Sequence, residues 1–131
     1  MARTVVTQLM FEGKAEEAMT LYVSLFPNSA ITHVERFGLD EQGTPGAVKR
    51  ATFTLCGQAM MCFDSSVKHA FTFTPAISLF VECESEAEQR AAWDRLSEGG
   101  QALMPLGDYG FSRRFGWVAD RFGVSWQLDL A

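Results

Sequence analysis

The chain has 131 residues, of which 47% are hydrophobic, 12% aromatic and 21% charged. This composition excludes wholesale disorder, and the length suffices for one sizeable core but not for two ordinary domains. The net charge is −5, and the only adjacent basic residues are Lys49–Arg50 and Arg113–Arg114. Because a nucleic-acid-binding surface needs a basic stripe, we expect no nucleic-acid partner.

The sequence also carries no signal for a membrane or for the secretory pathway. No apolar run approaches the roughly 18 residues of a membrane span, and a strand-like pattern begins within the first residues. We therefore expect a cytoplasmic protein that does not bind a membrane. The cysteines, Cys56, Cys62 and Cys83, are odd in number and lack CxxC spacing, which predicts buried thiols rather than disulfides or a zinc site.

The first half of the chain predicts a strand, a helix and three more strands. β-Branched residues favour a strand over residues 4–10. After Gly13, apolar residues recur every three or four positions until Pro27, which predicts a helix with one buried face. Strands are expected over residues 30–37, 48–56 and 59–64, the last two joined by a tight turn at Gly57–Gln58.

The second half repeats this order. A strand is expected over residues 75–83, followed by a helix that opens with a capping box from Ser85 to Glu88 and stops at Gly99–Gly100. Further strands are expected over residues 101–104, 114–119 and 124–130. The chain thus reads as two βαβββ modules offset by roughly 70 residues.

This repeat predicts an α+β fold. One module cannot bury both faces of its sheet, whereas two modules could curl their sheets into a half-barrel with the helices outside. We expect a single domain over residues 1–131, built from modules 1–66 and 72–131 with a connector between them. The concave inner face of such a half-barrel, a cup, is the expected ligand site.

Several sequence blocks resemble the PhnB-like family, which is also named demethylubiquinone-methyltransferase-like. They are Phe11–Ala18, Leu25–Ser29, Pro75–Ser78, Val81–Ser85, Trp93–Gly100 and Asp120–Gln127. The resemblance covers nearly the whole chain and implies the vicinal-oxygen-chelate superfamily, with glyoxalase I, extradiol dioxygenases and bleomycin-resistance proteins. It further implies a half-barrel of paired βαβββ modules and a homodimer.

The resemblance also implies where a metal would be held. Catalytic members of the superfamily bind a divalent cation through four side chains, typically His and Glu, on the first, fourth, fifth and eighth strands. The corresponding positions here are Gln8, Cys62 or its neighbour Met61, Ala76 and Gln127. None is His, Asp or Glu, and neither histidine of the chain has a partner at ligand spacing. We therefore expect no metal site and no cofactor.

The candidate site residues follow from strand alternation and from the segment at residues 105–114. Gln8 and Gln127 are expected to point into the cup, where their amides would orient a neutral polar ligand or bond to each other or to backbone. Trp126 should point the opposite way, under a helix. The predicted ligand-binding residues are Gln8, Cys62, Ser78, Trp117, Gln127, Tyr109 and Arg113.

The segment at residues 105–114 is the candidate lid, because it combines two glycines with aromatic residues. Arg113 and Arg114 could hold a carboxylate or phosphonate there. The alternative is a surface loop whose arginines pair with Asp108 or with solvent.

The sequence favours a small-molecule binder with a metal-free cup. The alternative is an enzyme, lyase, isomerase or transferase-like, whose acid–base groups would be Asp64, Cys62 or the two arginines Arg113 and Arg114. A structural or regulatory subunit is a third hypothesis. Methyl transfer is not expected, because no strand-to-helix turn is rich in glycine as an S-adenosylmethionine site requires.

Overall fold

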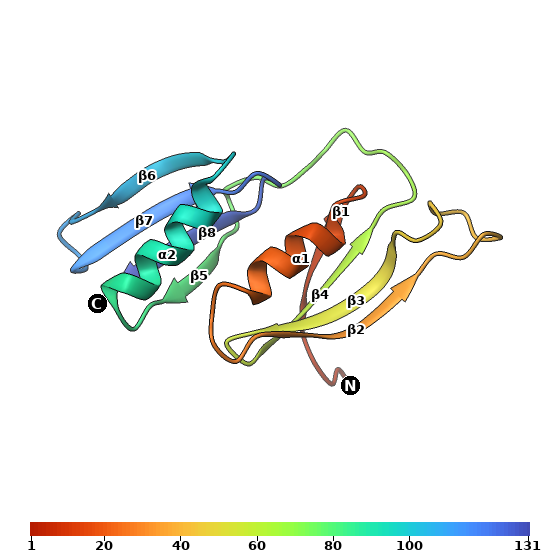
Figure 1. Cartoon of the computed structure of the whole chain (residues 1–131), viewed down its shortest axis with the longest axis horizontal. Coiled ribbons are helices and arrows are strands. Elements are labelled where there is room, and N and C mark those ends of the chain that lie inside the picture. The colour runs from red at the N-terminus through yellow and green to blue at the C-terminus, as the bar shows by residue number, and fades with distance from the viewer. The chain divides into compact units, whose positions relative to one another are not determined.

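The same order of elements occurs twice in the computed structural model, which describes residues 1–131. The chain divides into two units, Met1–His69 and Ala70–Ala131. Each unit holds a four-stranded sheet and one helix, in the order βαβββ (Figure 1). The α+β fold class predicted from the repeat is therefore confirmed.

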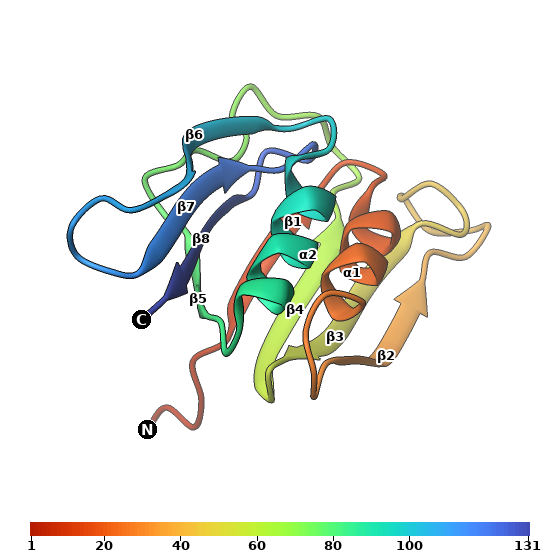
Figure 2. The ribbon, with the colours of Figure 1, turned by 60° about the vertical axis from the view of Figure 1, so that its left-hand side comes forward.

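The first unit carries sheet 1, with strand order β1-β4-β3-β2. Its elements are β1 (Thr7–Phe11), α1 (Ala15–Val23), β2 (Ala30–Arg36), β3 (Val48–Leu55) and β4 (Gln58–Asp64). β1 runs parallel to β4, and the other neighbours are antiparallel. α1 packs on β3 and β4, so one face of sheet 1 is covered by its helix (Figures 1 and 2).

The second unit carries sheet 2, with strand order β5-β8-β7-β6. Its elements are β5 (Leu79–Glu82), α2 (Glu86–Ser97), β6 (Gln101–Gly107), β7 (Arg114–Ala119) and β8 (Ser125–Leu130). β5 runs parallel to β8, and α2 packs on β7 and β8. We call the face of each sheet that is turned away from its own helix the helix-free face.

Two elements of the first unit are shorter than the sequence pattern predicts. β1 begins at Thr7 rather than at residue 4, because its pairing with β4 begins only at Thr7 and Met60. α1 ends at Val23, three residues before Phe26, the last residue ahead of the expected stop at Pro27. There the Ser24 and Leu25 amides bond to carbonyls three residues back, which tightens and ends the helix.

The strands at the start of the second unit also differ from their expected bounds. β5 is confined to Leu79–Glu82, because β8 offers it partners only from Trp126 to Asp129. β6 extends to Gly107, well past residue 104, through two irregularities in its pairing with β7. These irregularities let the strand bend and continue where a regular ladder would stop.

The predicted helix cap at Ser85 is confirmed. The Ser85 hydroxyl accepts a hydrogen bond from the Glu88 amide at 3.1 Å, which satisfies one free donor of the first turn of α2. The return bond differs by one residue from the usual capping box, since Glu88 accepts from the Glu84 amide rather than from that of Ser85.

A buried carboxylate closes the turn between β7 and β8. Asp120 accepts hydrogen bonds from the Phe122 and Val124 amides and from the Trp126 indole Nε1 at 3.0 Å. Trp126 is fully buried, as strand alternation predicts. Neither helix of the protein is long and apolar enough to cross a membrane.

Candidate functional site

Strand alternation places Gln127 on the helix-free face of sheet 2, opposite to the buried Trp126. Trp117 is the register partner of Gln127 across β7 and β8, so its side chain lies on the same face. Both side chains are half-buried. The helix-free face of sheet 2 therefore presents an amide and an indole side by side.

A hydrogen-bonded network joins these two residues. The Gln127 Nε2 donates to the Ser78 hydroxyl at 3.2 Å, and the Ser78 and Ser125 hydroxyl oxygens lie 2.7 Å apart. The Trp117 Nε1 donates to the Ser125 hydroxyl at 2.8 Å. We call Ser78, Trp117, Ser125 and Gln127 the serine–amide network. It unites three of the residues predicted from the sequence through Ser125, which the sequence reasoning missed.

Two carboxyl groups lie next to this network. Asp129 follows Gln127 by two positions on β8 and is almost fully buried, and Glu82 is its register partner on β5. Desolvation raises the pKa of Glu82, and the charge of Asp129 and a hydrogen bond to it add to the effect. The Ser112 hydroxyl also donates a hydrogen bond to Asp129. Both acids were missed from sequence, although their alternation with Gln127 could have indicated them.

The candidate lid at residues 105–114 is anchored at several points rather than free. The Tyr109 hydroxyl donates to the Pro105 carbonyl, and the Phe111 ring centroid lies 5.0 Å from that of Phe115. The Tyr109 ring is stacked on Phe111, with centroids 6.3 Å apart. With the bond from Ser112 to Asp129, these contacts fix both ends of the candidate lid.

The two arginines expected beside this lid differ in their surroundings. The Arg114 Nε donates to Gln89 Oε1 at 2.6 Å, and its guanidinium also bonds to the Glu86 carbonyl. The Arg114 side chain is thus hydrogen-bonded to residues of α2 and does not point a free guanidinium toward a ligand. Arg113 is exposed, and the nearby Asp108 carboxylate accepts the Gly110 amide instead of pairing with an arginine.

The remaining predicted residues lie in the first unit and do not share one face. Gln8 is exposed on the helix-free face of sheet 1, where its register partner is Met61. Cys62 lies on the opposite face, fully buried, with its thiol 3.7 Å from the Met19 sulfur. Burial raises the pKa of Cys62 to about 12, with a contribution from Asp64, so the thiol stays protonated and is no acid–base group near neutral pH.

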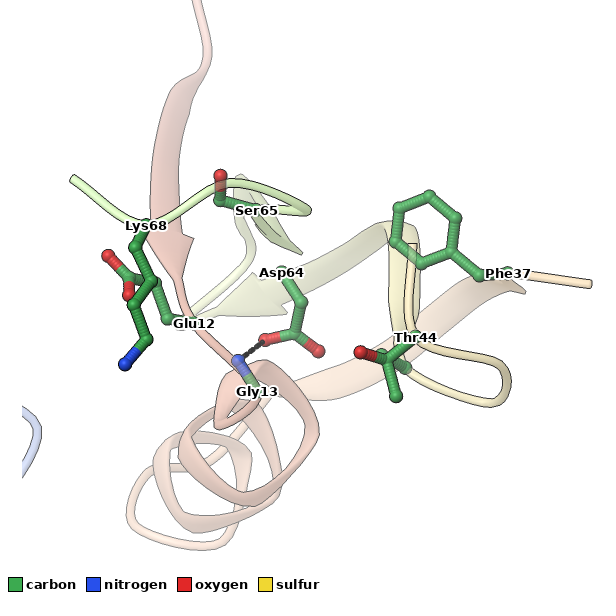
Figure 3. Close-up of a pocket in the computed structure, with 8 residues that line it drawn as sticks. Glu12, Gly13, Phe37, Thr44, Asp64, Ser65 and Lys68 are labelled. Atoms are coloured by element: carbon green, nitrogen blue, oxygen red, sulfur yellow. Dashed lines mark hydrogen bonds between the residues drawn. The ribbon is translucent and has the colours of Figure 1, made fainter. Parts of the chain in front are cut away.

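Asp64 is likewise committed to the fold. Its Oδ1 accepts the Gly13 amide at 2.8 Å (Figure 3) and the Ala15 amide at 2.9 Å. Its Oδ2 accepts the Val48 amide at 3.0 Å. The carboxylate is buried and joins the start of α1 to the start of β3. The role of Asp64 as an acid–base group is therefore not supported, because its oxygens already serve three backbone donors.

The donor set does not fit a divalent cation. Of the four positions expected from the superfamily, Gln8 and Gln127 carry amides and Met61, on the helix-free face of β4, carries a thioether, whereas Ala76 lies before β5 rather than on it. No group of three His, Cys, Asp or Glu side chains is placed to hold a metal ion. Divalent cations prefer imidazole, carboxylate or thiolate ligands, so we derive no metal-dependent step.

Two βαβββ units with these sheets define a protein of the glyoxalase-type, vicinal-oxygen-chelate fold class. The fosfomycin resistance protein FosX from Listeria monocytogenes, solved in complex with Mn(II), matches 98% of this chain and 92% of its own, with a TM-score of 0.67. The two are 9% identical, so this likeness shows the fold alone.

The particular family follows from the sequence comparisons. The family described as 3-demethylubiquinone-9 3-methyltransferase matches residues 3–129. A PhnB protein from Bacillus cereus is 54% identical over 98% of this chain and 100% of its own, with a TM-score of 0.96. A Pseudomonas aeruginosa protein is 25% identical over 98% of both chains, with a TM-score of 0.83. The chain therefore belongs to this PhnB-like family. No curated protein matches it.

Proposed function

We propose that the protein binds a small polar molecule on the helix-free face of sheet 2, without a metal ion. The observation that carries the proposal is the serine–amide network, in which four side chains from β8, β7 and the segment before β5 meet through hydrogen bonds. Ligand sites combine an apolar wall with a few convergent polar groups, and Trp117 with Gln127 provides this combination.

The network leaves specific groups available to a ligand. The Gln127 Nε2 donates one hydrogen to Ser78, and the amide oxygen, which the network does not use, is offered to a hydrogen-bond donor on the ligand. The Trp117 Nε1 is occupied by Ser125, so the indole offers its ring face. We infer a ligand with a hydroxyl or amine donor beside a flat apolar part. Tyr109 and Arg113 of the candidate lid supply further contacts in this proposal.

A thermal-shift screen of small metabolites tests the proposal. A ligand present at 100 times its Kd should stabilise the fold by about 2.7 kcal/mol, which corresponds to a shift of several degrees. The shift should shrink in Gln127→Leu and persist in Gln58→Leu, which removes an exposed amide from the first unit. A panel without any stabilising compound, or an unchanged shift in Gln127→Leu, would contradict the proposal.

A second candidate function is proton transfer by the same face. Glu82 and Asp129 are register partners on β5 and β8, and the raised pKa of Glu82 lets its carboxyl keep a proton to higher pH than an ordinary glutamate. A ligand held by the serine–amide network would then lie beside a carboxyl group suited to donating a proton. Glu82→Gln and Asp129→Asn should each strongly reduce any turnover found and alter the pH profile of what remains, and unchanged turnover in both variants would exclude this role.

The family name describes a methyltransferase, and we do not extend that activity to this chain. The connection between β1 and α1 holds one glycine, Gly13, and the connection between β5 and α2 holds none. Gly-rich turns of the S-adenosylmethionine type are thus missing at both strand-to-helix steps.

We further propose that the chain works as a single cytoplasmic domain that forms a homodimer. The family resemblance supports the dimer, and the expected cytoplasmic location rests on the sequence alone. Light scattering coupled to size-exclusion chromatography should give twice the mass of one 131-residue chain. A mass of one chain across micromolar concentrations would rule the dimer out.

A further inference from the structure

The first unit contains a cavity that is separate from the helix-free face of sheet 2. It lies where three segments meet: the turn between β1 and α1, the connection from β2 to β3, and the end of β4 (Figure 3). Its volume is about 290 Å³, and its lining residues are Glu12, Gly13, Phe37, Thr44, Ala47, Asp64, Ser65 and Lys68. At about 30 Å³ per water, this is room for roughly ten waters or for a molecule of amino-acid size.

Asp64 makes this cavity rigid. Its carboxylate lies at the end of β4 and accepts hydrogen bonds from both of the other segments that form the cavity. The Gly13 and Ala15 amides belong to the turn between β1 and α1, and the Val48 amide follows the connection from β2 to β3. The Ser65 amide adds a bond of 2.7 Å to the Phe11 carbonyl. The walls are therefore held together before any ligand arrives, which lowers the entropy cost of binding.

Two further residues keep the cavity open and give it an apolar side. Gly13 has a φ of +96°, and no atom lies within 4 Å of the place where a Cβ would stand. The Phe37 ring lies against Gly43, where a Cβ would come within 2.4 Å of the ring atoms. This contact fixes the ring at the edge of the cavity, opposite Glu12 and Lys68 (Figure 3).

The opposite side carries both signs of charge. The Lys68 ammonium takes part in none of the ion pairs of the chain. The Glu12 carboxylate accepts one bond, from the His69 amide at 3.3 Å. Together with Asp64, the lining holds two carboxylates and one ammonium group. A ligand with only a negative charge would be repelled by the two carboxylates, and a ligand with only a positive charge would be repelled by Lys68.

We propose that this cavity binds a small zwitterion of the α-amino-acid class. The carboxylate of the ligand pairs with Lys68 and its ammonium pairs with Glu12. The apolar side chain of the ligand packs on Phe37, and the Thr44 hydroxyl, which points toward the cavity centre, adds a hydrogen bond (Figure 3). A zwitterion satisfies both charges at once, which neither a monoanion nor a monocation does.

A titration of the isotope-labelled full chain followed by amide NMR tests this assignment. The probes are L-leucine, isocaproate, which lacks the amino group, and isoamylamine, which lacks the carboxylate. Leucine should shift the Gly13, Thr44 and Ser65 amides and should bind about two- to five-fold more tightly than either analogue, since each lost exposed ion pair is worth that factor. Equal binding of all probes, or no shift at these amides, would overturn the proposal.

Matched charge variants separate the cavity from the rest of the surface. Lys68→Met and Glu12→Gln should each weaken leucine binding by about two- to five-fold. Lys14→Met, just before α1, and Glu17→Gln, in its first turn, change the same charges outside the lining and should leave binding unchanged. If leucine instead shifts only the amides of Gln127 and Ser78, the cavity assignment fails while the proposed function of sheet 2 stands.

Discussion

The two sheets share one backbone plan, but matched positions on the helix-free faces of β4 and β8 carry different side chains. Matching the parallel pairs Leu9–Cys62 and Val81–Leu128, both turned toward the helices, aligns the two registers. Ala59, Met61 and Phe63 of β4 then correspond to Ser125, Gln127 and Asp129 of β8, and Met10 corresponds to Glu82. The repeated backbone determines the direction of each side chain, whereas the chemistry of the side chains determines what kind of ligand a face could bind.

This difference gives β4 and β8 different capacities for hydrogen bonding on these faces. The serine–amide network could select a ligand by its hydrogen bonds, whereas the matched residues Met61 and Phe63 offer only apolar contact. The alignment also decides the register of the fourth strand, because the position equivalent to Gln127 is Met61 and not Cys62.

Asp64→Ala should have the largest effect on stability, because the two units hold their helices differently. The first unit ties α1 to its sheet through the Asp64 carboxylate, and the matching position in the second unit is the apolar Leu130. Removing three hydrogen bonds to buried or half-buried amides should lower the free energy of unfolding by roughly 3 kcal/mol or more. Urea unfolding measures this, with the exposed Asp40→Ala as control, and equal midpoints for the two variants would refute it.

Of the two exchanges between the matched residues Gln127 and Met61, only the one in sheet 2 should change the affinity for a ligand. Gln127→Met gives sheet 2 the side chain of sheet 1 and should weaken any ligand found by the screen about ten-fold, the value of one well-placed hydrogen bond. Met61→Gln makes the reverse change and should leave affinity unaltered. Calorimetric titration decides this, and similar losses in both variants would place the ligand elsewhere.

Glu82 of the second unit and Glu16 of the first should make the stability of the fold depend on pH in opposite directions. The pKa of Glu82 is raised in the fold, so its contribution to stability is present at low pH and is lost as pH rises through the raised value. Glu82→Gln should therefore remove a decline in the urea midpoint above about pH 4.3, the ordinary pKa of Glu. Met10→Gln, at the matched position of sheet 1, should keep the decline. An identical pH profile in Glu82→Gln and the unmodified protein would contradict the raised pKa.

The smallest expected effect concerns Glu16, on the surface of the first unit. Its hydrogen bonds to Arg36, at 2.7 and 2.9 Å, lower the pKa of the carboxyl, so this stability is present above the ordinary Glu pKa and is lost as pH falls. Because both side chains are exposed, Glu16→Gln should cost only about 0.2–1 kcal/mol, less at high salt. A cost that salt does not reduce would show that the pair acts by more than charge.

The elements and the faces of the strands could be predicted from sequence because they depend on local periodicity. Trp126 and Gln127 illustrate this, since alternation alone sets them on opposite faces. The register of the fourth strand could not be predicted from sequence, because a shift of one residue puts Cys62 instead of Met61 on the helix-free face.

The roles of Asp64 and Asp129 could not be predicted for a different reason. Their partners are distant in sequence: Asp64 binds the Gly13 amide, 51 residues away, and Asp129 meets Glu82 only through strand pairing. Local patterns identify a carboxylate but not the donors that it meets. The same holds for Ser125, whose place in the serine–amide network depends on hydrogen bonds to Ser78 and Trp117, which are distant in sequence or on another strand.

The position of β8 within sheet 2 has a consequence for synthesis on the ribosome. The final strand is an interior one, lying between β5 and β7, so the second unit cannot close until its last residues have been made. The first unit needs nothing beyond β4 to complete its own sheet, so the hydrogen bonds of that sheet can form while the rest is still being translated. A chain that stops before residue 125 would therefore hold one complete sheet and one sheet without its central strand β8, whose unpaired strand edges favour aggregation.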